Sequence, residues 1–388
     1  MEIYLAIFLS FLAALLISLY EIPIVVRIVR KLNLLDHPNE RSSADKSIPT
    51  LGGIAIFMSF IMSSTIGMSV CDFPEMKFII PSIVLIFFVG LTDDILNIPP
   101  LKKLAFQIIV ACILVFLAKI RFTNLHGTFG VWEIGPVTGS LLTCFTIVVL
   151  INAFNLIDGI DGLAAGVTML IAFVLGAWFL ISDHFAFAII SFTLVGSVLG
   201  FLYYNVYGTK NKIFMGDTGS LVIGTLVSVL IIEFNEHNID QTQTYAIQSA
   251  PAISFGILSY PLMDLIRVII IRIAHFRHPF RADKNHFHHR LLTLGLSHRQ
   301  ATFSIIGFNI LFIIGVFYLN RTGFLNIMFY VFVACVILVM VPAFVIKKLK
   351  LIHADDPVQQ LLVPMTPEEI LKNQKEKSSK KRRKVKIT

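Results

Sequence analysis

The chain has 388 residues, of which 56% are hydrophobic and 14% charged, with a net charge of +8. Soluble domains carry about 25% charged residues, so this composition excludes an ordinary soluble protein and predicts an all-α polytopic membrane protein. The four cysteines are scattered, which argues against a disulfide framework or a zinc site. The first 20 residues lack a basic leader and a cleavage site, so we interpret them as a retained span.

Hydrophobic segments follow one another along the whole chain, and each can cross a bilayer core of about 30 Å. We count eleven, with ten as an alternative: residues 2–22, 50–70, 78–94, 103–119, 138–157, 163–182, 184–205, 218–235, 248–272, 302–320 and 325–346.

The distribution of lysine and arginine predicts the orientation of these spans. With the first connecting loop in the cytoplasm, all but Lys77, Lys119, Arg121 and Arg321 of the 32 basic residues fall on the cytoplasmic side. This bias places the N-terminus outside and the C-terminus in the cytoplasm. We therefore expect a transmembrane domain at 1–346 and a basic, disordered cytoplasmic tail at 347–388.

Four polar clusters fall at span ends that this orientation places on the cytoplasmic face. "LTDD" closes the third span, "NAFNLIDGIDGL" follows the fifth, "KIFMGDTGSL" opens the eighth and "HFRHPFRADKNHFHHRLL" follows the ninth. The outer loops carry no comparable cluster. A purely structural scaffold would not need this convergence, so the sequence predicts a functional site on the cytoplasmic face.

The acidic clusters suit a magnesium ion. Asn152, Asn155, Asp158 and Asp161 recur every third residue, and the glycines among them predict that the helix ends near Asp158. Carboxylate and amide oxygens are ligands that Mg²⁺ prefers. Simpler interpretations are a Gly-Asx turn here, a membrane stop signal with lysine counter-charges at "LTDD", and a helix cap at "GDTGS". At that cap the helix N-terminus would also favour a phosphate.

The loop after the ninth span is rich in arginine and in histidine. The cytoplasmic bias predicts the arginines but not six of the chain's eleven histidines. Zinc is conceivable, but a diphosphate site explains both residue types. Acids that bind Mg²⁺ and bases that bind diphosphate predict phosphoryl transfer from a cytosolic nucleotide-diphosphate donor to a lipid.

An ion-coupled transporter is the alternative from another class of protein. It would need ionisable groups near the middle of the bilayer and broken helices there. The interiors of the predicted spans carry almost no ionisable residues. We interpret the main exception, Asp264 and Arg267, as a structural ion pair.

Five motifs in order, "DHPNERSS…IPTLGG", "LTDD", "NAFNLIDGIDGL", "KIFMGDTGSL" and "HFHHRLL", resemble the polyprenyl-phosphate N-acetylhexosamine-1-phosphate transferases over residues 1–345. The resemblance implies transfer of HexNAc-1-phosphate, GlcNAc-1-phosphate first among them, from a UDP-sugar to undecaprenyl phosphate, with UMP released. It implies Mg²⁺, with Mn²⁺ as an alternative, and a multi-pass protein of the bacterial cytoplasmic membrane. Its partners are the two substrates and membrane lipid, without nucleic acid; a homodimer is one option.

The resemblance also assigns roles to residues. Asp217 matches the main metal ligand and Asn155 a second one, while Asp93 and Asp94 match paired aspartates near the lipid phosphate, one of them suggested as a base. The full expected set is Asp93, Asp94 and Asp158 for catalysis, Asp217 and Asn155 for metal, and Lys46, Asn152, Asp161, Asn205, Phe214, Arg281, His286, His288 and His289 for substrate.

The motifs also bear on the choice of sugar. "HFHHR" resembles the GlcNAc-1-phosphate branch and lacks the three consecutive histidines and acid of the pentapeptide translocases. However, Ala44 stands where many relatives have histidine, and Asn205 lies twelve residues before Asp217 without the usual proline. Another UDP-HexNAc or UDP-MurNAc-pentapeptide therefore stays an alternative donor.

The predicted orientation can be tested by chemical labelling. A cysteine introduced in the loop 281–290, in a background without the four native cysteines, should react with impermeant reagents from the cytosolic side only. Inside-out and right-side-out vesicles provide the two measurements. Labelling in right-side-out vesicles would overturn the orientation.

Overall fold

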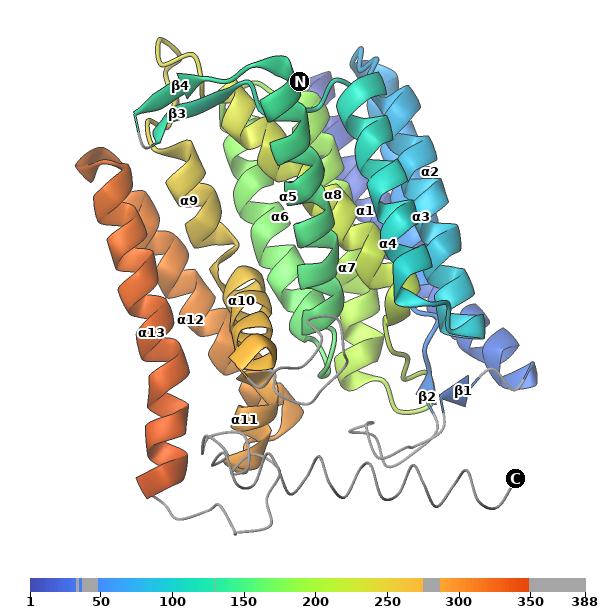
Figure 1. Ribbon diagram of the computed structural model, residues 1–388. Coiled ribbons are helices and arrows are strands. Elements are labelled where there is room, and N and C mark those ends of the chain that lie inside the picture. The colour runs from blue at the N-terminus through green and yellow to red at the C-terminus, as the bar shows by residue number, and fades with distance from the viewer. Residues whose placement is uncertain (33–34, 37–47, 129, 275–286, 349–388) are drawn as a thin grey trace, which may run out of the picture. The chain divides into compact units, whose positions relative to one another are not determined.

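A computed structural model describes residues 1–32, 35–36, 48–128, 130–274 and 287–348 and is mostly helical, as predicted (Figure 1). The chain divides into two units, residues 1–337 and 338–388. The second unit is described only in the last residues of one helix, so the predicted tail at 347–388 lies almost entirely outside the described residues.

The helices of the first unit pack side by side, and short connections join most of them (Figure 1). They are α1 (Glu2–Lys31), α2 (Gly53–Gly67), η1 (Met68–Val70), α3 (Met76–Leu96), α4 (Pro100–Cys112), the π-helical η2 (Ile113–Leu117), α5 (Pro136–Ile157), α6 (Leu163–Ile181), α7 (Phe185–Tyr207), α8 (Gly216–His237), α9 (Ala250–Ile257), α10 (Ser259–Ala274), α11 (Phe287–Thr293), α12 (His298–Tyr318), η3 (Asn320–Thr322) and α13 (Phe324–Lys348).

Two short antiparallel hairpins correct the all-α prediction. β1 (Leu35–Asp36) pairs with β2 (Ile48–Pro49), and β3 (Asn124–Thr128) pairs with β4 (Val131–Glu133) at the opposite end of the bundle (Figure 1). Gly127 lies in the second hairpin with a φ of 73°, a conformation that glycine adopts at low cost. We name the two ends of the bundle after them, the β1–β2 end and the β3–β4 end.

In the described part of the chain, nine helices are long and apolar enough to cross a membrane, and the bent pair α9–α10 makes a tenth if it is one span. All eleven predicted segments contain helix, but the count of eleven spans is not confirmed. The predicted span at 248–272 is divided into two helices, because α9 and α10 meet at Leu258 with a bend of 74°. Pro261 explains the break, since its ring clashes with the carbonyl one turn earlier.

Helix α8 is the centre of the bundle. Its side chains from Thr218 to Ile232 are all buried, and it packs against α2, α3, α5, α6 and α9. Glycines bring its first turn close to α2 and α3: a Cβ on Gly53 would lie 2.1 Å from the backbone nitrogen of Gly219, and a Cβ on Gly90 would lie 2.6 Å from the carbonyl oxygen of Asp217. The start of α8 therefore lies directly against two neighbouring backbones.

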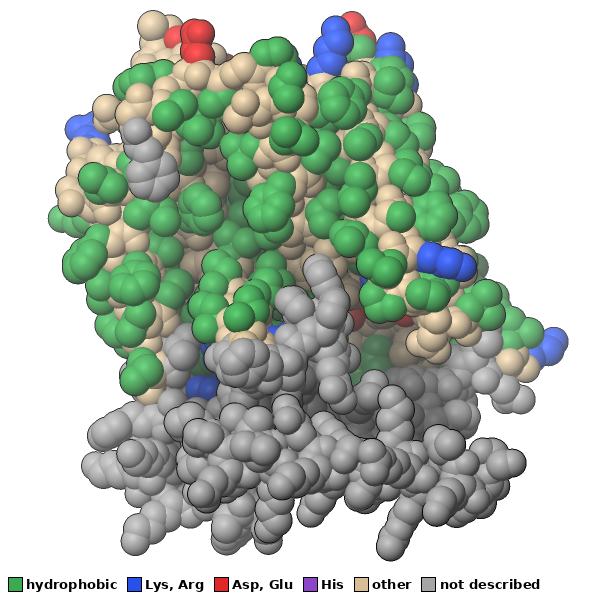
Figure 2. Space-filling model, in the orientation of Figure 1, with side chains coloured by type: hydrophobic (Ala, Val, Ile, Leu, Met, Phe, Trp, Pro, Cys, Tyr) green, Lys and Arg blue, Asp and Glu red, His purple; other side chains and the backbone are tan. Residues whose placement is uncertain are grey.

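Hydrophobic side chains are spread over the lateral face that Figure 2 shows. Phe88, Phe145 and Phe303 are each more than half exposed. Exposed apolar surface of this extent is excluded from water and suits lipid. The chain is therefore a multi-pass membrane protein.

Two histidines stack at the β3–β4 end of α8. The ring of His184, between α6 and α7, lies 3.7 Å from the ring of His237 on α8, measured between centroids. Glu233 Oε2 lies 3.5 Å from Nε2 of His237. Burial lowers the pKa of His184, although Gln243 and Asp183 act in the opposite direction. The folded chain therefore favours the neutral imidazole.

We predict a loss of thermal stability in mild acid because of this stack. A histidine whose pKa is lowered by folding contributes stability above its unfolded pKa of about 6.5, and this contribution is lost as the pH falls. The unfolding midpoint in detergent should fall between pH 7.5 and pH 5. His184→Phe, which keeps the stacking, should reduce the pH dependence; an unchanged dependence would contradict the assignment.

Candidate functional site

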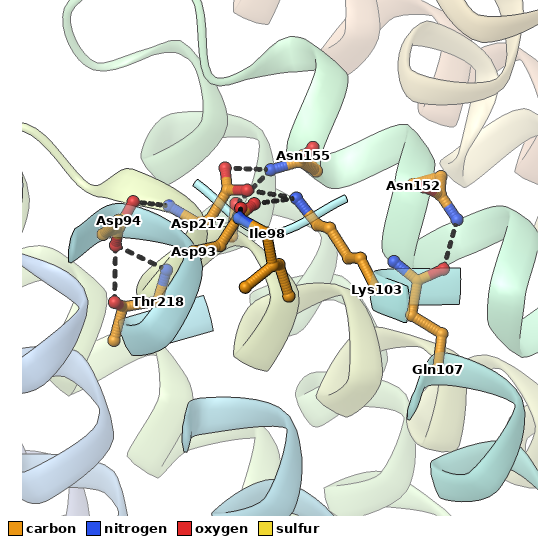
Figure 3. Close-up of polar contacts among 10 residues, drawn as sticks. Asp93, Asp94, Ile98, Lys103, Gln107, Asn152, Asn155, Asp217 and Thr218 are labelled. Atoms are coloured by element: carbon orange, nitrogen blue, oxygen red, sulfur yellow. Dashed lines mark hydrogen bonds and ion pairs between the residues drawn. The ribbon is translucent and has the colours of Figure 1, made fainter. Parts of the chain in front are cut away.

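The polar clusters predicted from the sequence meet at the β1–β2 end of the bundle (Figures 1 and 3). Hydrogen bonds and close contacts join the end of α3, the start of α4, the end of α5, the start of α8 and the start of α11. The predicted convergence on one face is therefore confirmed for the described residues.

Asp94, at the end of α3, caps the start of α8. Its Oδ1 accepts the backbone N–H of Asp217 at 2.8 Å, and its Oδ2 accepts the N–H of Thr218 at 2.9 Å and the Thr218 hydroxyl at 2.5 Å (Figure 3). The expectation that α8 caps itself is wrong, because its cap comes from another helix. The backbone amides of Asp217 and Thr218 are likewise not free to bind a phosphate, because both already donate to the carboxylate of Asp94.

Gly216 makes this cap possible. Its φ of 72° favours glycine, and a Cβ there would lie 2.2 Å from the carbonyl oxygen of Thr50 and 2.5 Å from Asp94 Oδ2. The glycine of the "GDTGS" motif is thus required by the approach of α3 and of the segment before α2.

Lys103, in the first turn of α4, bridges two carboxylates. Its ammonium lies 3.0 Å from Oδ2 of Asp93 and also contacts Oδ2 of Asp217. Asn155 donates from Nδ2 to Oδ1 of Asp217 at 2.6 Å and to the hydroxyl of Ser220 at 3.0 Å. Asp217 therefore lies at the centre of a network from α3, α4, α5 and α8 (Figure 3).

Asp158 adds a further acid beside this network. Helix α5 ends at Ile157, as the sequence predicted, and the chain turns through Gly162 with a φ of 77°. Burial, together with the neighbouring Asp217 and Asp94, raises the pKa of Asp158 to about 8. This end of the bundle therefore carries an excess of acidic groups that favours a cation.

Two predicted substrate residues make internal contacts instead. Asn152 donates to Oε1 of Gln107 at 2.7 Å, toward α4 and away from Asp217 (Figure 3). The buried Asn205 accepts the N–H of Gly162 at 2.6 Å and donates to the carbonyl of Ile213 at 2.8 Å. The structure gives Asn205 an architectural role, and the substrate contacts of both residues stay predictions.

Asp161 and Phe214 lie together with two basic groups. Lys212 Nζ lies 2.5 Å from Oδ2 of Asp161, and His298 Nδ1 lies 3.8 Å from the same oxygen. The Lys212 ammonium is 6.0 Å from the centre of the Phe214 ring. The resemblance implies that Asp161 and Phe214 both lie near the uridine of the donor, and the structure brings the two residues together.

His288 connects the start of α11 to the turn after α5. It is buried, and a Cβ on Gly159 would lie 2.3 Å from its Nε2. Asp264 fixes this approach by accepting the N–H of Phe287 at 2.7 Å, and the predicted pair with Arg267 is confirmed at 3.8 Å. Of the remaining predicted residues, Lys46, Arg281 and His286 lie outside the described residues, and His289 is described only by its place in α11.

Sequence reasoning missed the two lysines of the site. Lys103 was considered only as a counter-charge to a stop signal, and Lys212 was not considered. The signal for Lys103 is the pair of prolines between it and Asp93, because a proline at the first helical position marks the start of a new helix close to the end of α3. Lys212 had a weaker signal, since it is the first residue of the "KIFMGDTGSL" motif.

Carboxylates bridged by an ammonium at one end of a membrane bundle define a site for cations and phosphate groups. Comparison with known proteins then identifies the group to which the chain belongs. The model of glycosyl transferase family 4 matches residues 76–235, which include most of this site. The chain belongs to this family.

Its relatives have related names. The undecaprenyl-phosphate alpha-N-acetylglucosaminyl 1-phosphate transferase of Escherichia coli is 30% identical over 279 residues, which are 71% of this chain and 73% of that protein. The probable undecaprenyl-phosphate N-acetylglucosaminyl 1-phosphate transferase of Bacillus subtilis is 33% identical over 302 residues, 77% and 81% of the two chains. The Yersinia pestis transferase is 29% identical over 279 residues.

The cap between helices predicts a stability effect. Asp94→Asn should lower the free energy of unfolding by about 1 kcal/mol, because an amide cannot accept all three hydrogen bonds and carries no charge toward the helix N-terminus. The unfolding midpoint in detergent measures this loss. Thr92→Ala removes an exposed hydroxyl on the same helix and serves as the control; equal midpoints for the two variants would contradict the cap.

Proposed function

We propose that the chain transfers GlcNAc-1-phosphate from UDP-GlcNAc to undecaprenyl phosphate, giving undecaprenyl-diphospho-GlcNAc and UMP. An oxygen of the lipid phosphate attacks the phosphorus that bears the sugar. The bond from this phosphorus to the bridging oxygen breaks, and UMP leaves with that oxygen. The family and the names of the relatives support this reaction.

The observation that carries the proposal is the network around Asp217. It joins two carboxylates, an amide and an ammonium from four helices at one point. Phosphoryl transfer depends mostly on positioning and on charge stabilisation, which such a network supplies.

The residues of this network fit Mg²⁺. Among the described residues, no three acidic, histidine or cysteine side chains are placed to bind a metal on their own. However, Mg²⁺ in phosphoryl-transfer sites commonly uses one or two carboxylates and completes its shell with water and substrate phosphates. The ammonium of Lys103 lies between Asp93 and Asp217, where its positive charge shows that this position favours a cation. We propose Asp217 and the Asn155 carbonyl as ligands; bound Mg²⁺ would stabilise the charge on the leaving UMP.

The chain's own residues perform the remaining work. Asp94 positions Asp217 through the start of α8 and is a positioning residue in this proposal. Asp93 orients Lys103, whose ammonium can contact an incoming phosphate. Burial and the neighbouring carboxylates raise the pKa of Asp158, which favours its neutral form, and a cation bound at Asp217 would favour the charged form. The expected assignment of Asp93, Asp94 and Asp158 to catalysis thus becomes a proposal with separate roles.

We place the site at the cytoplasmic face of the bacterial inner membrane, because the connecting loops at this end contain most lysines and arginines. A cytosolic UDP-sugar reaches the site from water there, while the isoprenoid chain lies along the apolar lateral surface.

The names of the relatives favour GlcNAc over another UDP-HexNAc or UDP-MurNAc-pentapeptide. The bent pair α9–α10 is a feature that transporters also use, but the family match does not favour an ion-coupled transporter.

The test is transfer of radiolabel from UDP-GlcNAc to undecaprenyl phosphate by the purified protein in detergent. We expect label in lipid and release of UMP with Mg²⁺, and no product with EDTA until Mg²⁺ is added again. Asp217→Asn should lower kcat at least about 100-fold at saturating Mg²⁺, since it removes a charge from the phosphoryl-transfer centre.

Lys210→Met, which changes an exposed residue outside this network, provides the control and should retain full activity. Transfer that is indifferent to EDTA would contradict the Mg²⁺ requirement. Absence of transfer with every UDP-HexNAc, from folded protein, would contradict the proposed function.

A further inference from the structure

The end of helix α7 is contacted by arginines from two other helices. Arg299, in the first turn of α12, donates to the carbonyl of Val206 at 2.7 Å, and its guanidinium lies 4.9 Å from the centre of the Tyr207 ring. Arg30, in the last turn of α1, donates to the carbonyl of Lys210 at 2.5 Å, just beyond α7. Two guanidinium groups from distant parts of the sequence therefore lie at the end of α7, at the β1–β2 end of the bundle (Figure 1).

The structure of the chain explains only part of this arrangement. The last carbonyls of a helix carry partial negative charge and lack partners within the helix, so a nearby arginine is stabilising. Each contact with a carbonyl uses one nitrogen, whereas a guanidinium has five N–H donors. Both arginines are exposed. Capping of α7 therefore leaves most of their donors at the surface.

No carboxylate compensates the positive charge of these two arginines in the described part of the chain. Their hydrogen bonds there go to carbonyl groups, whereas the lysines of the acidic clusters contact aspartates. The surrounding sequence has no aspartate or glutamate at 22–32, 203–211 or 295–304. Because a carbonyl dipole does not neutralise a full charge, the end of α7 favours an anion from outside the chain.

Exposed tyrosines and apolar side chains place the two arginines at the edge of the bilayer. Tyr203 and Tyr207 lie one turn apart on α7, with ring centres 6.3 Å apart, and they are 56% and 54% exposed. Tyrosines of this kind gather where lipid headgroups meet hydrocarbon. On α1, farther from this end than Arg30, Leu16 and Tyr20 are 56% and 74% exposed. An anion at the arginines would thus have apolar surface beside it.

The charge and the apolar surface together select the ligand. Guanidinium groups bind phosphate oxygens through paired hydrogen bonds. A soluble phosphate would be attracted by the charge but would gain nothing from the tyrosines and the apolar surface. A zwitterionic phospholipid has its own cation beside the phosphate, which weakens the attraction. An anionic phospholipid satisfies both requirements.

We propose that Arg30, Arg299, Tyr203 and Tyr207 form a binding site for the headgroup of an anionic phospholipid. The guanidinium groups donate to the phosphate, the tyrosine rings contact the glycerol region, and the acyl chains follow the lateral surface of α1 and α7. The bound lipid joins α1 and α12 to the end of α7, from which the chain continues to the start of α8. This site is separate from the network around Asp217 and does not depend on the proposed reaction.

The test is native mass spectrometry of the purified full-length protein in detergent, with dioleoyl phosphatidylglycerol or dioleoyl phosphatidylcholine added. The unmodified protein should bind its first phosphatidylglycerol more tightly than its first phosphatidylcholine. The double variant Arg30→Gln, Arg299→Gln should weaken phosphatidylglycerol binding about tenfold and leave phosphatidylcholine binding unchanged, because it removes both charges. Lys77→Gln with Arg321→Gln removes two exposed charges at the β3–β4 end and is the matched control.

A further variant tests the charge without removing the contacts of α7. Arg30→Lys with Arg299→Lys keeps both charges and a donor for each carbonyl, so it should fold and keep its preference for phosphatidylglycerol. Loss of that preference overturns the inference, even where the glutamine variant fails to fold. Unchanged phosphatidylglycerol binding in the folded glutamine variant, or an equal loss for both phospholipids, overturns it as well.

Inorganic phosphate distinguishes a lipid site from a site for any free anion. Phosphatidylglycerol should stay bound to the unmodified protein when inorganic phosphate is added in excess, since the free ion lacks acyl chains. Displacement of the lipid by inorganic phosphate would overturn the inference, because the arginines would then bind a soluble anion.

Discussion

The carboxylate of Asp94 accepts the two backbone amides with which α8 begins. Helix α3 ends at this point and α8 starts there, so the end of one helix and the beginning of another share one side chain. The contact requires glycine at 90 and 216, because a Cβ at either position would collide with the facing chain. The position of Asp217, and with it the geometry of the network, depends on this contact.

The second constraint is electrostatic. Five aspartates gather at one end of the bundle in the described part of the chain, where burial makes uncompensated charge costly. In the described residues, Lys103 compensates Asp93 and Asp217, while Lys212 compensates Asp161. The free protein is thus held together by internal cations at the places where substrates and metal are proposed to bind. Substrate charge can replace these contacts instead of adding to an unbalanced site.

The sequence predicted the helices because apolar runs of about 20 residues leave few alternatives in a bilayer. It also predicted that the polar clusters converge, because the basic residues fix which span ends share a face. It could not predict that Asp94 caps α8, since the two partners are more than 100 residues apart in the chain. The expected counter-charge at "LTDD" is confirmed, because Lys103 pairs with Asp93. The contacts of Lys103 with Asp217 and of Lys212 with Asp161 were not predicted, since each joins residues far apart in the chain.

At two other positions the structure differs from the prediction although the sequence contained a relevant residue. Pro261 is compatible with a kink, a break or a loop, and only the packing of α9 and α10 selects the bend at Leu258. Asn205 was assigned to substrate by its place in a motif, whereas its amide joins α7 to the turn at Gly162. A polar residue in a motif can bind substrate or can hold neighbouring segments together by internal hydrogen bonds. The sequence does not distinguish these two roles.

The hydrogen bond from Phe287 to Asp264 has a consequence for how this chain can change over evolution. It joins the first residue of α11 to Asp264, a buried carboxylate of α10. A substitution at 264 therefore alters both the packing of α10 and the start of α11. We expect these two helices to change together in related chains, so that a replacement on one is followed by a matching replacement on the other.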